Sequence, residues 1–332
     1  MKIEDQRREL LKKITNINAS SFESVAMDVF RYQAIHNPLY ADYLRLIGKA
    51  PSSIQTIEEI PFLPIRFFKS HQIKTNIWPT EQVFTSSGTT GMATSQHHVR
   101  DINWYQQVSM SCFAPFYGSP SDYCILALLP SYLERSGSSL VFMADFFIKQ
   151  SKYETSGFFL HEKTLLLKTL DECIKNNTPT ILLGVSFALW NLAEEHPVDL
   201  KNVIIMETGG MKGRRQEITR PELHDILKNA FNVERIHSEY GMTELLSQAY
   251  STGNGVFHPG PGMRILIREI TDPFSINSFN KNGVINIIDL GNLDSISFVA
   301  TEDLGKVYED NSFEIIGRLD ASDVRGCNLM VL

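Results

Sequence analysis

The sequence has few cysteines, and none of them are paired at the spacing of a metal or redox motif. Its 332 residues include four, Cys112, Cys124, Cys173 and Cys327, and no two of these form a Cys-x-x-Cys pair. This spacing argues against a zinc site built on cysteine pairs and against the disulfide framework of a small secreted domain. We therefore expect a reduced, cytoplasmic protein.

Long apolar runs are also missing. The most apolar stretch, residues 181–190, is interrupted by Gly184 and Ser186, and a bilayer span needs roughly 20 apolar residues. The first 13 residues are charged and lack the apolar segment of a signal peptide. Positive charge is not in excess, since Lys and Arg total 31 against 38 Asp and Glu, a net charge of −7. This balance does not favour nucleic-acid or anionic-membrane partners, and we expect neither.

What the sequence does contain is a composition close to that of an ordinary globular protein, with 43% hydrophobic and 21% charged residues. A chain of this length can bury a large core without disulfides. Patterning predicts an α/β fold in successive parts. These parts are a helical lead and proline-rich connection over 1–80, an α/β core over 81–255 and a β-rich subdomain over 256–319.

Local patterns predict individual elements of these parts. Ser20 and Glu23 have the spacing of a capping box, and Pro38 begins a second helical stripe that Gly48 ends. In the core, strand-like runs occur at 82–84, 97–99, 124–129, 180–183, 203–206 and 233–237. In the subdomain they occur at 263–270, 284–289, 295–300, 306–308 and 313–316.

The strongest chemical signal is a run of seven small residues, Thr85-Ser-Ser-Gly-Thr-Thr-Gly91. Its glycines permit backbone conformations in which successive N–H groups converge on an anion, and its hydroxyls add donors. The run does not match the Walker A pattern. A phosphate-binding loop is the interpretation that we favour over a flexible linker, because strand-like runs flank it on both sides.

A second signal is the segment Glu239-Tyr-Gly-Met-Thr-Glu244. Tyr240 offers a flat face for a purine, Thr243 offers a hydroxyl to a phosphate, and Glu244 offers an oxygen ligand to Mg²⁺. The alternative is a strand-to-helix turn in which Thr243 is the N-cap.

A third signal joins Thr301-Glu-Asp-Leu-Gly305 with Gly317-Arg-Leu-Asp320. An aspartate in such a segment can accept both hydroxyls of a ribose, and a nearby arginine can donate to the sugar or to phosphate. The alternative is two ordinary β-turns.

The order of these motifs, with Gly209-Gly210 between the first two, resembles the acyl-adenylate-forming superfamily of AMP-dependent synthetases and ligases. The resemblance covers roughly residues 60–327. Within the superfamily, this sequence is most similar to the phenylacetate–CoA ligase branch and, closer still, to the bacterial acyl-protein synthetases (LuxE-like). Three segments carry this finer likeness: the short N-terminal lead, Pro61-Phe-Leu-Pro-Ile65 and Arg325-Gly-Cys-Asn-Leu-Met330.

The resemblance implies a role for each motif residue. The phosphates of ATP would be held by the loop residues Ser86, Ser87, Gly88, Thr89, Thr90 and Gly91. Gly209 and Gly210 would border adenine and Tyr240 would stack on it, with Gly241 also in the nucleotide site. Thr243 would contact the α-phosphate and Glu244 would bind Mg²⁺. Asp303 and Arg318 would hold the ribose. The acyl group would pack against Val185, Ser186 and Phe187.

The resemblance also has departures. The lysine usual after the phosphate loop is absent at 92–94, and residues 320–332 are expected to be a hinge remnant and tail in place of the family's C-terminal domain. Cys327 then becomes a candidate acyl acceptor, with a buried apolar role as the alternative. Two basic features stand near the motifs. His97-His98 could replace some of the missing positive charge, but we favour an ordinary strand-edge pair. The cluster Lys212, Arg214 and Arg215 could contact a diphosphate, a carrier or the CoA 3′-phosphate, but we favour a solvated turn.

The function that follows is activation of a carboxylic acid, fatty or aryl, with ATP and Mg²⁺. The acyl-AMP would then pass its acyl group to a thiol of a protein, an acyl carrier or a reductase partner. Two alternatives remain: a module that binds nucleotide or acyl-AMP with little turnover, and the adenylating half of a complex that a partner completes.

Overall fold

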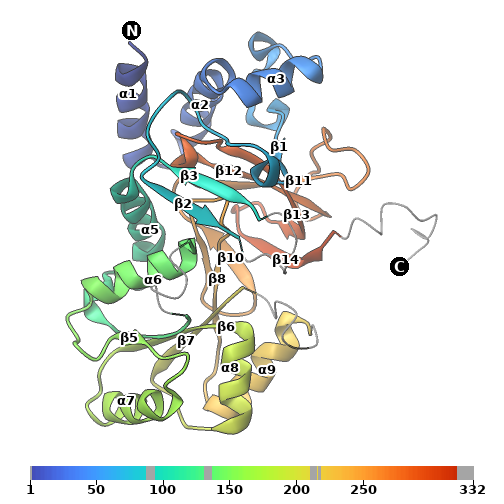
Figure 1. Cartoon of the computed structure of the whole chain (residues 1–332). Helices are drawn as coiled ribbons and strands as arrows, with labels where there is room; N and C mark the ends of the chain where they lie inside the picture. The colour runs from blue at the N-terminus through green and yellow to red at the C-terminus, as the bar shows by residue number, and fades with distance from the viewer. Residues whose placement is uncertain (1, 87–93, 131–136, 210–214, 216–217, 320–332) are drawn as a thin grey trace. The chain divides into compact units, whose positions relative to one another are not determined.

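A computed structural model describes residues 2–86, 94–130, 137–209, 215 and 218–319. The chain divides into two compact units (Figure 1). Unit 1 comprises Met1–Pro79 and Pro261–Leu332, and unit 2 comprises Thr80–Gly260. In the described residues, no helix has the length and apolarity of a membrane span.

Unit 1 combines the N-terminal helices with the β-rich end of the chain. Its helices are α1 (Ile3–Thr15), α2 (Phe22–His36), α3 (Pro38–Leu46) and the short α4 (Phe67–Ser70). Its antiparallel strands run in the order β11 (Met263–Arg268), β12 (Asn282–Asp289), β13 (Phe298–Val307) and β14 (Phe313–Arg318), and β1 (Leu63–Pro64) pairs parallel with β13.

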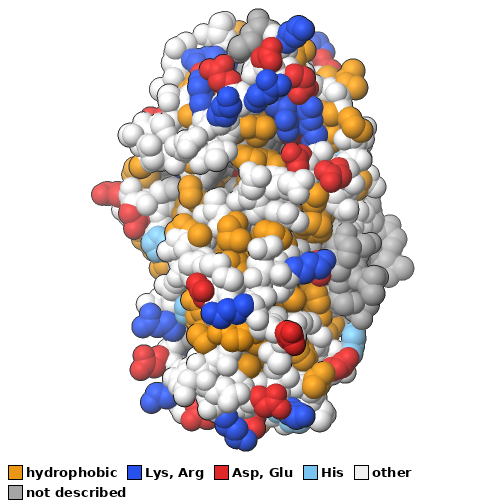
Figure 2. Space-filling model, turned by 90° about the vertical axis from the view of Figure 1, so that its left-hand side faces the viewer, with side chains coloured by type: hydrophobic (Ala, Val, Ile, Leu, Met, Phe, Trp, Pro, Cys, Tyr) orange, Lys and Arg blue, Asp and Glu red, His pale blue; other side chains and the backbone are white. Residues whose placement is uncertain are grey.

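The helical lead packs directly on the strands of unit 1. The Phe30 ring meets the Phe298 ring edge-on with centroids 6.0 Å apart. The fully buried amide of Gln33 donates to the carbonyls of Asn292 and Leu293 at 3.0 Å each. These contacts make the lead part of the core of unit 1. On the face drawn in Figure 2, charged side chains of both signs are mixed at one end of the molecule. Within the helical lead, Lys13 and Asp28 form an ion pair at 2.9 Å.

Unit 2 is a mostly parallel sheet with helices between its strands. The strand order is β10 (Val256–Pro259), β9 (Ala249–Ser251), β8 (His237–Tyr240), β7 (Val203–Thr208), β6 (Thr180–Val185), β4 (Cys124–Leu128) and β5 (Gly157–Phe158). All pairs from β5 to β8 are parallel, and β9 and β10 are antiparallel additions. Every residue of β4 and β6 is buried, as expected for central strands covered on both faces.

The helices of unit 2 are α5 (Ile102–Tyr117), α6 (Ser139–Gln150), α7 (Lys163–Lys175), α8 (Ser186–Glu195) and α9 (Arg220–Phe231). Helix α6 contacts β4, and α8 contacts β6, β7 and α9. A separate hairpin pairs β2 (Gln82–Thr85) with β3 (Gln96–Val99). This alternation of strands and helices confirms the predicted α/β fold.

Some local predictions are confirmed and others are wrong. Helix α3 begins at Pro38, and Gly48 has the positive φ (70°) of a residue that ends a helix. The capping box at Ser20 and Glu23 is wrong, because α2 begins at Phe22 and the Asn18 side chain takes the N–H groups of Ser20 and Ser21 instead.

Two strand predictions also differ from the structure. The strand-like pattern at 233–237 predicts a strand, but β8 begins only at His237, because the left-handed Asn232 ends α9 and the Val233 N–H donates back to the Lys228 carbonyl. The predicted strands at 295–300 and 306–308 are one strand, β13. Its pairing register shifts between Leu304 and Gly305, so the Asp-Leu-Gly sequence forms an irregularity inside the strand.

Candidate functional site

The Ser/Thr/Gly segment begins at Thr85, the last residue of β2 in the β2–β3 hairpin. Thr85 is paired with Gln96, so residues 86–95 connect the two strands. At the base of this loop Ser86 donates its N–H to the Ser95 carbonyl at 3.2 Å, and its hydroxyl accepts from the Ser95 N–H at 2.9 Å. The prediction of flanking strands is confirmed. Ser87 to Gly91, which are predicted to bind phosphate, lie outside the described residues.

The Tyr240–Glu244 segment follows the carboxyl end of β8, where parallel sheets place their binding loops. The Tyr240 ring is 9% exposed and meets the Phe257 ring edge-on at 5.9 Å. Thr243 is half-buried, Glu244 is buried, and both lie in a turn. No helix begins at Thr243, so the alternative interpretation of this threonine as an N-cap is wrong.

His97 connects the hairpin to this turn. Its Nδ1 lies 2.8 Å from the carbonyl oxygen of Thr243. Burial lowers the pKa of His97 to about 4, so the ring is neutral near pH 7 and donates its Nδ1 hydrogen to that carbonyl. The hairpin that carries the first motif is therefore bound to the second motif.

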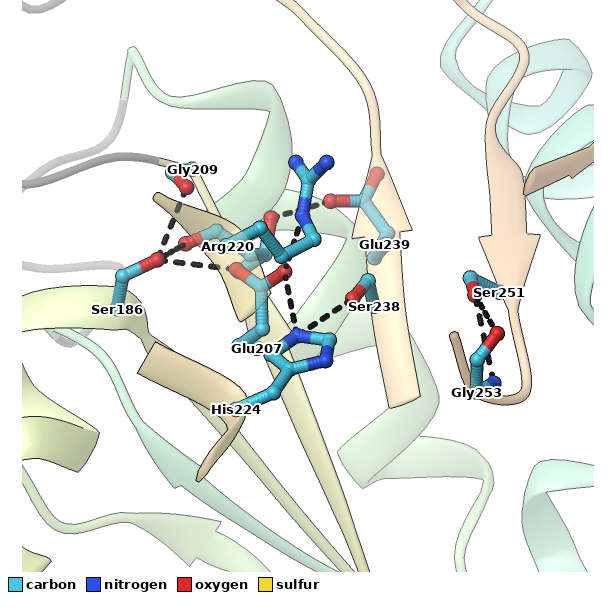
Figure 3. A network of polar contacts seen from close by, with 10 residues as sticks. Ser186, Glu207, Gly209, Arg220, His224, Ser238, Glu239, Ser251 and Gly253 are labelled. Carbon is cyan, nitrogen blue, oxygen red and sulfur yellow. Dashed lines mark hydrogen bonds and ion pairs between the residues drawn. The ribbon is translucent and has the colours of Figure 1, made fainter. Parts of the chain in front are cut away.

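A polar network at the ends of β6 and β7 is drawn in Figure 3. Its centre is Glu207, fully buried at the end of β7. Arg220 donates its Nε hydrogen to Glu207 Oε1 at 3.1 Å, and His224 Nε2 lies 3.6 Å from the same oxygen. The Ser186 hydroxyl lies 3.0 Å from Glu207 Oε2 and 2.9 Å from the Gly209 carbonyl oxygen.

The charge state of Glu207 follows from these contacts. Burial by itself would raise the pKa of the carboxyl, but hydrogen bonds from His224 and Ser238 and the charge of Arg220 hold it below its usual value. The carboxylate is therefore ionised at neutral pH and is compensated by one neighbouring arginine.

A second contact joins the ends of β7 and β8. The Thr208 hydroxyl donates to the buried carboxylate of Glu239, the residue before Tyr240. A Cβ atom on Gly241 would lie 2.5 Å from Glu239 Oε1. A side chain at position 241 would therefore have to displace the Glu239 carboxylate, which accepts from the Thr208 hydroxyl. Gly209, at the end of β7, has a φ of 71°, which also favours glycine.

Sequence reasoning missed the members of this network other than Ser186 and Gly209. The available signal was an acidic residue at the end of an apolar strand, Glu207 after Val203–Met206, opposite a basic residue that starts a helix. The pairing of Glu207 with Arg220 depends on how β7 and α9 pack, which the sequence pattern does not contain.

The third motif lies in unit 1. Asp303 in β13 is opposite Arg318 in β14, so the interpretation of these segments as two turns is wrong. The Asp303 N–H donates to the Thr301 hydroxyl at 3.1 Å. Arg318 Nη2 lies 3.4 Å from Glu302 Oε2, and Arg66 donates to the other oxygen of Glu302.

The segment assigned to the acyl group stands at the end of β6. Val185 is buried, Ser186 starts α8 with its hydroxyl in the network described above, and Phe187 is half-buried. A Cβ atom on Gly184 would lie 2.7 Å from Leu189 Cγ, so glycine is required for α8 to pack on β6.

Two other predicted features fall partly or wholly outside the described residues. Gly210, Lys212, Arg214 and Cys327 are not described. Arg215 is described, and it pairs with both carboxylate oxygens of Glu194 at 3.0 and 2.6 Å and stacks on the Trp190 ring at 4.4 Å. Its charge is therefore paired with a carboxylate of helix α8.

The described residues contain no cluster of three or more His, Cys, Asp or Glu side chains that would hold an ion by itself. Mg²⁺ that accompanies a nucleotide needs only one or two carboxylates besides the phosphates. The buried carboxylate of Glu244 fits that kind of site.

Comparison with known proteins identifies the fold. No protein-family model matches the sequence, and no curated protein matches it. Among solved structures, an open form of 2-hydroxyisobutyryl-CoA ligase in complex with 2-HIB-AMP and CoA has a TM-score of 0.67 at 14% identity, over 93% of this chain and 78% of that chain. ATP-bound MatB from Rhodopseudomonas palustris has a TM-score of 0.53 at 15% identity, over 71% of this chain and 47% of that one.

A long-chain-fatty-acid–CoA ligase (FadD1) from Archaeoglobus fulgidus gives 0.53 at 15% identity, over 72% of this chain and 52% of its own. This chain thus has the mixed α/β fold of the large N-terminal domain of acyl-adenylate-forming ligases. It spans about half the length of MatB.

Proposed function

We propose that this protein activates a carboxylic acid with ATP, forming an acyl-AMP and releasing pyrophosphate. The observation that carries the proposal is the hydrogen bond from His97 to the Thr243 carbonyl, because it joins the two segments that the motif resemblance assigns to the phosphates of ATP. Solved neighbours with the same fold include a ligase bound to ATP and one bound to an acyl-AMP.

The proposal assigns each motif residue one task. Tyr240 stacks on adenine beside Gly241, and Gly209 and Gly210 border the base. Asp303 and Arg318 bind the ribose. Thr243 donates to the α-phosphate, while the β- and γ-phosphates are held by the loop residues Ser86, Ser87, Gly88, Thr89, Thr90 and Gly91.

The reaction needs positioning and charge neutralisation from the protein. A carboxylate oxygen of the acid attacks the α-phosphorus in line, a new P–O bond forms, and the bond to the pyrophosphate oxygen breaks. The Thr243 hydroxyl supplies a hydrogen bond where negative charge develops, and the loop hydroxyls orient the leaving group. Glu244 would bind Mg²⁺, which neutralises phosphate charge when bound.

The acid that we propose is a fatty or aryl acid. Val185 is buried and apolar, and the neighbouring Phe187 adds an aromatic face. These side chains favour an apolar acyl group over a charged one. Ser186, the third residue of this wall, has its hydroxyl committed to Glu207 and Gly209.

The activated acyl group is proposed to pass to a protein or carrier thiol. The thiolate attacks the carbonyl carbon, a thioester forms, and AMP leaves with the electron pair of the broken C–O bond. Cys112, Cys124 and Cys173 are buried, and burial raises the pKa of Cys124 to about 11, so these three are poor nucleophiles. Cys327 is the remaining candidate within the chain; an acyl carrier or reductase is the candidate partner.

Two measurements test these steps separately. Acid-dependent exchange of labelled pyrophosphate into ATP tests adenylation, with fatty and aryl acids as the panel. Intact mass after incubation with Mg·ATP and the active acid tests self-acylation, which hydroxylamine should reverse and Cys327→Ala should abolish. A protein that exchanges pyrophosphate and gains no mass would contradict the role of Cys327 and leave adenylation standing.

A further inference from the structure

Arg220 stands at a position where its charge is unfavourable unless something compensates it. It is the first residue of helix α9, directly after the N-cap Thr219. The backbone N–H groups at a helix start carry partial positive charge, so a cation there is disfavoured. A contact outside the helix must therefore account for this arginine.

The first such contact is Glu207. The Nε hydrogen of Arg220 is donated to Glu207 Oε1 at 3.1 Å, and the carboxylate is fully buried. The other oxygen of Glu207 lies 3.0 Å from the Ser186 hydroxyl, which in turn lies 2.9 Å from the Gly209 carbonyl oxygen (Figure 3). Arg220 is thus connected through two side chains to the backbone at the end of β7.

The second contact is an aromatic ring. The Arg220 guanidinium lies 4.9 Å from the centre of the Phe257 ring. That ring packs edge-on against Tyr240 with centroids 5.9 Å apart. A planar guanidinium suits both tasks, since it can stack on a ring face while its N–H groups donate in the plane.

We propose that Arg220 is a positioning residue for recognition of the nucleotide base. Through Glu207 and Ser186 it fixes Gly209, and through Phe257 it fixes the Tyr240 ring. This inference rests on the proposed function, which assigns Gly209 and Tyr240 to adenine. It adds that discrimination between bases depends on a side chain that does not itself touch the nucleotide.

The test is a comparison of binding affinities for ATP and ITP, which differ only in the base, measured by calorimetry on the full chain. Arg220→Lys keeps the charge beside Glu207 but loses the planar group. We expect it to weaken ATP binding about tenfold and to lower the preference for ATP over ITP about fivefold, the effect of one or two well-placed hydrogen bonds. Acid-dependent turnover at saturating ATP should change less than twofold.

Two further variants test the two sets of contacts through which Arg220 is proposed to act. Ser186→Ala removes the hydroxyl at Gly209, and Phe257→Leu removes the ring between Arg220 and Tyr240. Each should lower the preference for ATP over ITP, but by less than Arg220→Lys does. The matched control is Arg235→Lys, an exposed arginine of the same unit, which should keep the ATP preference of the native protein.

The outcomes separate this inference from the proposed function. An unchanged ATP-to-ITP ratio in all three variants would overturn the inference and leave adenylation standing, as would a native protein that binds both nucleotides equally. A native protein that binds neither nucleotide would overturn both. A general loss of folding lowers the affinities for both nucleotides together and leaves their ratio unchanged, so the ratio reports positioning.

Discussion

The imidazole of His97 donates its Nδ1 hydrogen to the backbone carbonyl of Thr243 over 2.8 Å. The two residues are separated by 145 intervening positions, and neither motif near them predicts the other. The contact fixes the turn that contains Thr243 and Glu244 against the β2–β3 hairpin.

The stability of the protein should fall in mild acid because of His97. Burial lowers the pKa of this group from 6.5 to about 4, so the unfolded chain takes up a proton below pH 6.5 that the folded protein takes up only near pH 4. The free energy of unfolding is therefore highest above pH 6.5 and falls by up to about 3 kcal/mol between these values. Urea denaturation at a series of pH values measures it.

Substitution of His97 should flatten this dependence. His97→Gln removes one of two described imidazoles whose pKa is lowered to about 4 by burial, the other being His237. We expect the slope of stability against pH between 6.5 and 4 to fall by roughly half, whatever the absolute loss at pH 7. His196→Gln, at an exposed position, is the control. A slope in His97→Gln equal to that of the native protein would contradict the assignment of a buried neutral imidazole.

The Glu244 carboxylate should be required for metal-dependent chemistry. Glu244→Gln keeps the size of the buried side chain and removes the charge that binds Mg²⁺. We expect acid-dependent pyrophosphate exchange to fall at least about a hundredfold, because a lost charged contact in the transition state costs roughly 3 kcal/mol. Glu234→Gln, an exposed glutamate before β8, should retain exchange. Full exchange by Glu244→Gln would refute the metal assignment.

The Tyr240 ring should contribute to nucleotide affinity through its face and not through its hydroxyl. Stacking of a base on an aromatic side chain is worth about 1–3 kcal/mol. We expect Tyr240→Phe to keep the KM for ATP within about twofold and Tyr240→Leu to raise it about tenfold with little change in kcat. Steady-state kinetics at saturating acid make this measurement. An equal loss in both variants would point to the hydroxyl and against stacking.

Asp303 should distinguish ribose from deoxyribose. Its backbone is held by the 3.1 Å hydrogen bond to Thr301, so Asp303→Asn alters the side chain on a fixed strand. If the carboxylate accepts sugar hydroxyls, the native protein prefers ATP to 2′-deoxy-ATP, and Asp303→Asn reduces that preference about tenfold. Asp310→Asn, in the turn that follows β13, serves as the control. A preference that survives Asp303→Asn would exclude the ribose role.

The sequence predicted the parts of the fold that are set by local pattern. The apolar runs of the parallel sheet are buried on both faces, and the predicted runs at 124–129 and 180–183 correspond to β4 and β6 within one or two residues. Predictions of individual elements were wrong where one local sequence pattern is compatible with two different structures. Asp303-Leu-Gly305 is common in turns, but here strand pairing on both sides absorbs it as an irregularity in β13.

Local sequence patterns do not predict the contacts of the polar network. Glu207, Arg220 and Ser186 come from three different elements, and each is unremarkable in its local sequence. Their meeting is a consequence of the order β6, β7 and β8 in the sheet and of helix α9 packing beside them. Motif reasoning found residues proposed to touch the nucleotide, whereas those that position them emerged only from the tertiary contacts.

The central claim, that the acid attacks the α-phosphorus of ATP, is tested most directly with an acid labelled with ¹⁸O in its carboxyl group. The reaction is run with Mg·ATP and a thiol acceptor, and the nucleotide products are analysed by mass spectrometry. The account predicts AMP that carries one ¹⁸O atom, together with pyrophosphate, in amounts that depend on the acid. Formation of ADP, or of AMP without label, would contradict it.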